Sequence, residues 1–143
     1  MNTHSPDYFC SVATSILHLS IPVRSLPEAR DFYLGALGCR LGRETAEWCD
    51  VWFFGLQLTL QERPEEIRSP DEQGVRHFGV VLPDESEFRD VVARATKFGV
   101  TWIAAPKLHD DPRLSGKLGG KMADPSGNVI EIKWYRDPAE FLA

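Results

Sequence analysis

The sequence is poor in cysteine, and this scarcity excludes two classes of small protein. Only three of its 143 residues are cysteine, an odd number, and no two of them have the C-x-x-C spacing. Neither a disulfide framework nor a zinc ribbon is therefore expected. Cys10, Cys39 and Cys49 are interpreted as buried or inert thiols.

Long apolar runs and an excess of positive charge are also missing. No apolar run approaches the roughly 18 residues of a membrane-spanning helix, and residues 1–15 lack the basic start and apolar middle of a signal peptide. The charges are interspersed and sum to -5 at pH 7, so no basic arm is available for nucleic acid or anionic lipid. We expect a cytoplasmic protein that binds small molecules, with no nucleic-acid or membrane partner.

What is present fits one globular domain, with 43% hydrophobic and 26% charged residues. Apolar and polar residues alternate over 16–23, which predicts a strand. A helix is expected to begin after Ser25, a candidate N-cap, and to end at Gly38, a candidate left-handed C-cap. Three extended segments are then expected, at 39–43, 47–54 and 56–62.

The second half repeats this order after a linker, 63–74, that is rich in proline and charge. The expected elements are a strand at 75–83, a helix at 84–98 and strands at 101–105, around 120–123 and at 128–135. The intervening segments are expected to be a loop at 106–119, a tail at 136–143 and a loose N-terminal extension at 1–14. The repeat predicts an α+β fold in which two βαβββ modules, 15–62 and 75–135, form a curved mixed sheet within one domain, 15–143.

Four polar residues occupy matching places in this repeat. His18 and His77 lie in the first strand of each module, and Gln57 and Glu131 lie in the last strand. Large side chains flank each of them, and all of these neighbours except Arg76 are apolar. Side chains alternate across a strand, so all four are expected on the face opposite the helices. Two imidazoles and a carboxylate suit Fe(II), Mn(II), Ni(II), Co(II) or Zn(II), and they are also the ligand set of non-haem iron oxygenases.

A simpler interpretation exists for each residue alone, because polar side chains on the second face of an antiparallel sheet are usually just solvated. The coincidence of four repeat-related positions favours the metal site. Gln57 is the weakest of the four, since an amide is a poor ligand and could equally be a hydrogen-bonding residue of the pocket.

The segments ILHLSIPVRSLPEARDFYLGALG, RHFGVVLP and MADPSGNVIEIKWY resemble the vicinal oxygen chelate superfamily, which includes glyoxalase I, bleomycin-resistance proteins, fosfomycin-resistance thiol transferases and extradiol dioxygenases. The resemblance covers residues 16–135. It implies paired βαβββ modules, a homodimer, and His18, His77 and Glu131 as metal ligands. Gln57 matches the fourth ligand position of the glyoxalase type.

The resemblance implies a divalent-metal enzyme, dioxygenase-like or glyoxalase-like (a lyase or isomerase), that chelates two adjacent oxygens of a small substrate. Fe(II) is the first expectation for the metal. The four histidines of this chain are few for catechol cleavage, because extradiol dioxygenases are mostly longer and use further histidines as acid–base groups. The alternative is a metal-free protein of the bleomycin-resistance type that sequesters a small molecule.

Other polar side chains share or adjoin the face of the expected ligands. Glu131 and Tyr135 are the candidate acid–base residues. The candidate substrate-binding residues are Ser20, Thr59, Gln61 and Lys133. Lys133 would hold an anionic group, although a solvated lysine at a strand end is the commoner case. His109 lies in the expected 106–119 loop, which is a candidate lid.

Overall fold

The computed structural model describes residues 15–142, so the extension expected at 1–14, with Cys10, lies outside the described residues. The first module contains β1 (His18–Val23), α2 (Leu26–Leu37), β2 (Arg40–Glu44), β3 (Trp48–Phe53) and β4 (Leu56–Glu62). The second contains β5 (Phe78–Val81), α3 (Glu85–Phe98), β6 (Thr101–Leu108), β7 (Lys117–Ala123) and β8 (Val129–Tyr135). Two 3-10 turns, Pro64–Glu66 and Asp71–Gln73, lie between the modules, and a short helix α4 (Ala139–Leu142) follows β8.

Each module folds into its own four-stranded mixed sheet, which confirms the predicted fold class. The strand orders are β1-β4-β3-β2 and β5-β8-β7-β6, so the two sheets have the same topology. The first strand of each module pairs in parallel with the last strand, and the other pairs are antiparallel. The strands β1 and β5 are consequently edge strands, one in each sheet.

Local sequence signals explain where the first helix begins and ends. The Ser25 hydroxyl accepts a hydrogen bond from the Glu28 amide at 3.4 Å, and Gly38 adopts the left-handed conformation with φ 70°. In the second module Gly99 ends α3 with φ 93°, while Asp84 holds the N-cap position without a side-chain hydrogen bond. The predicted helix boundaries are therefore correct to within a residue.

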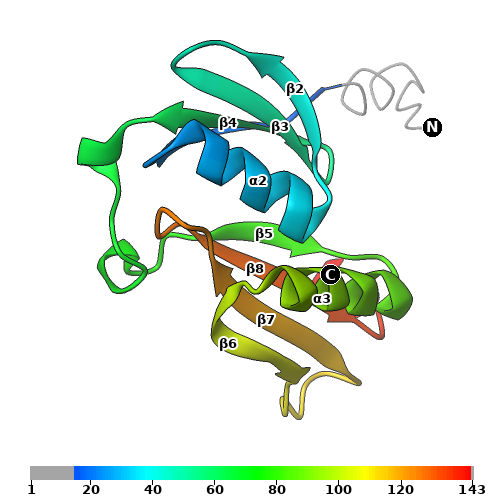
Figure 1. Cartoon of the computed structure of the whole chain (residues 1–143). Coiled ribbons are helices and arrows are strands. Elements are labelled where there is room, and N and C mark those ends of the chain that lie inside the picture. Colours follow the sequence, from blue (N-terminus) through cyan, green and yellow to red (C-terminus); the bar gives the residue numbers. More distant parts are fainter. Residues whose placement is uncertain (1–14, 143) are drawn as a thin grey trace, which may run out of the picture.

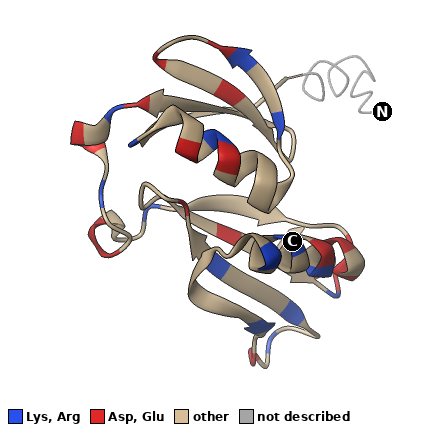
Figure 2. Cartoon of the chain, in the orientation of Figure 1, with Lys and Arg blue, Asp and Glu red and all other residues tan. Residues whose placement is uncertain are grey.

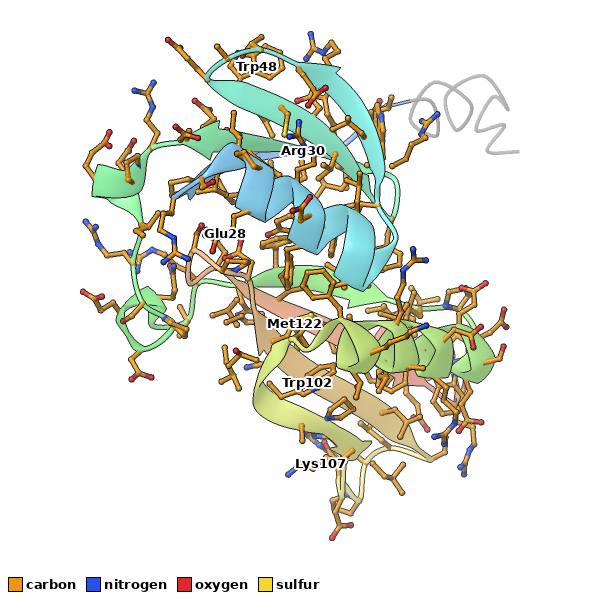
Figure 3. All side chains as sticks on the ribbon, in the orientation of Figure 1. Glu28, Arg30, Trp48, Trp102, Lys107 and Met122 are labelled. Atoms are coloured by element: carbon orange, nitrogen blue, oxygen red, sulfur yellow. The ribbon has the colours of Figure 1, made fainter. Side chains whose placement is uncertain are left out.

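The two helices lie between the sheets and share one hydrophobic core. Figure 1 shows α2 on the side of the first sheet that faces the second module, with α3 against the second sheet. Buried side chains from both modules form a single cluster, and Phe53 and Phe78 meet across the modules with ring centroids 5.2 Å apart. Met122 lies in this interior region in Figure 3. Each sheet therefore turns one face to the core and leaves its other face open.

A buried polar junction also joins the modules. The Tyr33 hydroxyl on α2 donates a 2.7 Å hydrogen bond to Asp124 in the turn before β8. Asp124 also accepts hydrogen bonds from the Ser126 and Asn128 amides, at 2.8 and 2.9 Å. The Asn128 side chain reaches back to the Pro22 carbonyl at 3.0 Å. The DPSGN turn is thus a clasp between modules as well as a hairpin turn.

Several predicted boundaries were wrong at strand ends. The loop predicted at 106–119 is shorter, because β6 extends to Leu108 and β7 begins at Lys117, leaving 109–116 between them. The predicted strand 75–83 is ordered as a strand only over Phe78–Val81, and the tail contains α4. Strands β6 and β7 are longer than their local sequences predicted, because pairing with each other extends them. None of the helices within residues 15–142 is long and apolar enough to cross a membrane.

Candidate metal centre

The second module brings two predicted ligands together at the junction of β5 and β8. His77 immediately precedes β5, and its Nε2 lies 3.6 Å from Oε1 of Glu131 on β8. The other ring nitrogen, Nδ1, lies 2.7 Å from the Val75 carbonyl oxygen. A carbonyl only accepts, so Nδ1 carries a proton in this hydrogen bond, and Nε2 is the ring nitrogen that faces Glu131. This is the orientation of a metal-binding histidine.

The first module orients His18 in the same way. Its Nδ1 lies 3.2 Å from the backbone carbonyl oxygen of Gln57, which leaves Nε2 free to act as a ligand. His18 stands directly opposite Gln57 in the parallel pairing of β1 and β4. Both side chains therefore lie on the open face of the first sheet, as the alternation predicted.

The four predicted ligands form two pairs within one chain rather than one cluster. Within the described residues no three His, Cys, Asp or Glu side chains are close enough to hold a metal ion. A hollow of about 240 Å³ is lined by His77, Glu131 and Lys133. A separate hollow of about 380 Å³ is lined by residues of the first module that include Ser20 and Gln61. Each hollow opens on its own sheet, because the core lies between the two.

The strand register shows that Gln57 and Glu131, which the sequence repeat matched, do not occupy equivalent positions in the two modules. In the second sheet Glu131 pairs with Gly79, two residues after His77, whereas in the first sheet Gln57 pairs with His18 itself. The position two residues after His18 pairs with Thr59. Thr59, rather than Gln57, is thus the positional counterpart of Glu131. Sequence matching missed this two-residue difference because strand parity is the same at both positions.

The Glu131 carboxylate is held in its charged form by cations around it. It is 17% exposed, and its Oε1 lies 3.3 Å from Lys133 Nζ. Burial acts to raise its pKa, but the nearby charges of Lys133, Lys121 and His77 outweigh burial, and the pKa is lowered from its usual value. An ionised carboxylate beside the Nε2 of a histidine is a suitable donor pair for a divalent cation.

A close approach of the backbone sets the geometry of this pair. A Cβ on Gly79 would lie 1.8 Å from the backbone oxygen of Glu131. Only glycine permits β5 and β8 to come together here, and this approach places His77 beside Glu131. The sequence showed Gly79 on the expected face but gave no sign that a larger residue would be excluded.

The predicted polar residues of the first module lie on its open face and contact one another. Gln61 Nε2 donates to the Ser20 hydroxyl at 2.5 Å. The Thr59 hydroxyl donates at 2.7 Å to Asp50, a buried carboxylate that the sequence analysis did not single out. Asp50 also accepts from Arg43 Nε at 2.8 Å. The charged groups at the centre of this face therefore neutralise each other.

Aromatic residues extend the open face of the first sheet. Trp48 lies on the side of this sheet away from α2, as Figure 3 shows. The guanidinium of Arg43 lies 5.1 Å from the Trp48 ring centroid, and that of Arg40 lies 5.9 Å from the Trp52 ring centroid. These are cation–π contacts. The first sheet thus offers flat aromatic surfaces, with Trp52 close to His18 and Trp48 four residues further away on β3.

The second sheet differs, because its open face is rich in lysine. Lys121 pairs with Glu131 across β7 and β8, and Lys117 pairs with Tyr135. Figure 2 shows these basic positions on β7 beside the acidic position on β8. Lys117 and Lys121 were missed by the sequence analysis, although their spacing of four residues within a strand places them on one face.

The catalytic candidate Tyr135 lies at the far end of β8. It is four residues from Glu131, roughly 13 Å along a strand, and Lys117 Nζ lies 5.4 Å from its ring centroid. Its ring also packs on Phe141 of α4, with centroids 4.6 Å apart. Tyr135 therefore belongs to the same open face but not to the immediate surroundings of His77 and Glu131.

A family model described as the glyoxalase/bleomycin resistance protein/dioxygenase superfamily matches residues 15–132. The chain belongs to this superfamily. The match covers both modules and both pairs of candidate ligands, and it agrees with the resemblance to vicinal oxygen chelate proteins. The superfamily takes its description from proteins of several activities, so membership shows the fold and leaves the reaction open.

Individual relatives agree with this assignment. A catechol-2,3-dioxygenase of Bacillus subtilis is 29% identical over 135 residues, which are 87% of this chain and 45% of that protein. The chain thus spans about half the length of this relative. A glyoxalase/bleomycin resistance protein/dioxygenase from Alicyclobacillus acidocaldarius is 29% identical, with a TM-score of 0.81 over 90% of this chain and 96% of that chain.

A fosfomycin resistance protein from Listeria monocytogenes is 12% identical, with a TM-score of 0.69 over 89% of this chain and 97% of that chain. A lactoylglutathione lyase from Agrobacterium tumefaciens is 18% identical, with a TM-score of 0.62 over 85% of this chain and 93% of that chain. These two likenesses show the fold alone.

Proposed function

We propose that this protein is a divalent-metal enzyme that acts on a small molecule with two adjacent oxygens, with oxygen chemistry on Fe(II) as the first candidate. The observation that carries the proposal is the pairing of His77 Nε2 with Glu131 Oε1 at 3.6 Å, with Nδ1 of His77 held by a backbone carbonyl. His18 has the same orientation on the first sheet. Together the three side chains make the 2-His-1-carboxylate set.

The preference for oxygen chemistry has two supports. The ligand set is that of non-haem iron oxygenases, and a relative named catechol-2,3-dioxygenase matches 87% of this chain. Glyoxalase-like chemistry is the second candidate, because the lyase from Agrobacterium tumefaciens shares the fold. The metal found in the purified protein separates them, with iron favouring the first and nickel, zinc or cobalt the second.

We further propose that the metal site is completed in a homodimer. His18 does not join His77 and Glu131 within the described residues, since no group of three ligands forms there. The two open faces lie on opposite sides of a shared core, so the first sheet of one chain would meet the second sheet of its partner. The edge strands β1 and β5 follow exposed apolar residues, Leu17 and Val75, which are 75% and 89% exposed. Burial of such residues favours association.

The residues of the chain have distinct proposed roles. A divalent ion held by His18, His77 and Glu131 would supply Lewis acidity that polarises two adjacent oxygens of the substrate. Lys133 keeps Glu131 ionised at 3.3 Å and so preserves its donor oxygens. Thr59, Gln61 and Ser20 would line the opposite wall, where their hydroxyl and amide groups can orient polar parts of the substrate. Gln57 stands beside His18, where its amide can hydrogen-bond to the substrate or complete the ligand set.

Metal content tests the enzyme proposal. The protein is purified without chelator or nickel column, beside Glu131→Gln, which keeps the shape of the side chain and removes its charge. We expect near-stoichiometric metal in the wild type, and a loss of affinity of about 100-fold or more in the variant. A wild type that stays metal-free when offered Fe(II), Mn(II), Ni(II) and Zn(II) would contradict the enzyme and favour the metal-free binding protein.

Subunit complementation tests the shared site. His18→Ala and Glu131→Ala chains are co-expressed with different tags, and the mixed dimer is isolated. Neither variant alone should hold metal, but the mixed dimer contains one intact site if ligands come from both chains. We expect it to recover about half of the wild-type metal per chain. Metal loss in all three forms would place the three ligands within one chain, or show that they do not act together.

A further inference from the structure

The open face of the second sheet carries more positive charge than is needed to keep the proposed metal ligand Glu131 ionised. Lys117 and Lys121 lie on this face because they pair with Tyr135 and Glu131 across the sheet. Gly119, between them, pairs with Lys133. This row of positions on β7 lies on the same face of the sheet as Glu131 and Lys133, which line the hollow beside His77.

Most of this charge has no ion-pair partner within residues 15–142. Glu131 pairs with Lys133 and His77, at 3.3 and 3.6 Å, whereas neither Lys117 nor Lys121 forms an ion pair with a described residue. The carboxylate of Asp111, in the adjoining loop, is paired with Arg113 at 2.8 Å. The surplus of lysine is notable in a chain whose net charge is -5, because such a chain repels anions elsewhere.

His109 covers the gap between the two lysines. Gly119 has no side chain, and a Cβ there would lie 2.8 Å from His109 Nε2, so the imidazole occupies this space. The adjacent backbone anchors the ring, because the His109 amide donates to the Lys117 carbonyl at 2.7 Å. Burial and the charges of Lys117 and Lys107 lower the pKa of His109. The imidazole thus lies in the positive field of these lysines, where its ring nitrogens can form hydrogen bonds.

We propose that Lys117, Lys121 and His109 form a subsite that binds an anionic group of the substrate, such as a carboxylate, phosphate or phosphonate. This inference rests on the proposed function, because it assigns the subsite to the same cup as the metal ligands. Lys121 stands opposite Glu131, and Gly119 and Lys117 lie two and four residues further along β7. The anionic group would therefore lie about 7–13 Å from the Glu131 position.

The distance defines a class of substrate. One end of the molecule presents two adjacent oxygens to the metal ligands, and the other end carries a negative charge toward Lys117. The aromatic surfaces of Trp52, near His18, and of Trp48, four residues away on β3, lie on the same face of the first sheet. In the proposed dimer they would face the middle of such a molecule and pack against a flat or apolar portion of it.

The subsite is tested by titrating the protein with inorganic phosphate at constant ionic strength while its backbone amide signals are monitored by NMR. We expect the amides of Gly119 and Gly120 to shift along a saturating curve, while Gly38, at the end of α2, stays unchanged. Lys117→Gln and Lys121→Gln should each weaken phosphate binding about five-fold. Lys97→Gln, at an exposed position of α3 outside the proposed subsite, is the matched control and should bind phosphate as the wild type does.

The same titration on His77→Ala separates this inference from the proposed function. This variant removes a proposed metal ligand and keeps the lysines, so phosphate binding should persist while metal is lost. Saturation that weakens in both lysine variants supports the subsite, whether or not the protein proves to hold metal. Shifts that never saturate, or an affinity equal in Lys117→Gln and wild type, would overturn it even in a protein that binds metal.

Discussion

The two modules share one topology but present different chemistry on their open faces. In the first sheet the central charges cancel, since Asp50 accepts from Arg43 at 2.8 Å, and tryptophan rings surround them. In the second sheet a single carboxylate, Glu131, lies among lysines. One module thus offers an aromatic wall, and the other offers a charged wall that contains the candidate ligand pair His77 and Glu131.

This contrast shows how a duplicated fold can form an asymmetric site. The helix-facing sides of both sheets contribute alike to one core, which restricts their side chains to apolar types. The open faces carry no such packing constraint. The candidate ligand on the last strand also differs in position, because Glu131 pairs two residues beyond His77 whereas Gln57 pairs with His18 itself. A two-residue change keeps every side chain on its face, so the fold tolerates it while the ligand geometry changes.

The largest expected effect comes from disturbing the close approach of β5 to β8 at Gly79 in the second module. Gly79→Ala would place a methyl group 1.8 Å from the Glu131 carbonyl oxygen and force β5 away from β8. We expect a loss of about 3 kcal/mol in the free energy of unfolding, measured by urea denaturation. Ser20→Ala, at the counterpart position of the first module, should change it by less than about 0.5 kcal/mol. Equal losses in the two variants would contradict the asymmetry.

A smaller effect is expected at the clasp that joins the modules. Tyr33→Phe removes the 2.7 Å hydrogen bond to buried Asp124 and should cost about 1–3 kcal/mol at neutral pH. Tyr135→Phe, with no described hydroxyl partner, serves as the control and should cost little. Thermal or urea unfolding measures both.

The pH dependence of the clasp provides a second check. Burial raises the pKa of Asp124, and its hydrogen bonds only partly offset this. The folded state therefore binds the Asp124 proton more tightly than the unfolded state does. The resulting stabilisation is present below the unfolded pKa and is lost as pH rises through the folded pKa. Because Tyr33 stabilises the ionised form, the penalty of Tyr33→Phe should be smaller at acid pH. A pH-independent penalty would contradict this.

The smallest expected effect is on the pKa of His109, which reports the electrostatic field of the lysines on the open face of the second sheet. Burial and then Lys117 and Lys107 lower the pKa of His109. Lys117→Gln removes one positive charge, so the His109 pKa should rise toward its usual value. The imidazole proton signals in an NMR titration measure this. Lys97→Gln is the control, and a His109 pKa that does not change in Lys117→Gln would show that the two residues lie too far apart to interact.

Local signals predicted most of the fold. The caps Ser25, Gly38 and Gly99 gave the helix ends because capping depends on a few adjacent residues. The ends of β6 and β7 were not predictable in this way, since a strand continues for as long as its neighbour supplies hydrogen bonds. The same reason explains why the predicted 106–119 loop proved shorter.

The candidate site was predictable residue by residue but not as an assembly. Strand parity placed His18, Gln57 and Glu131 on open faces, because parity is a property of the sequence alone. The 3.6 Å approach of His77 to Glu131 depends on the register of β5 with β8 and on Gly79.

The sequence by itself determined the repeated βαβββ order and which side chains lie on each face, because both follow from short-range periodicity and capping. Tertiary structure alone decided that the candidate ligands form two separate pairs, that Thr59 is the counterpart of Glu131, and that lysines gather beside the acid. These features depend on strand register and on the packing of both helices into one core. They arise from contacts between residues far apart in the chain, and no local pattern encodes them.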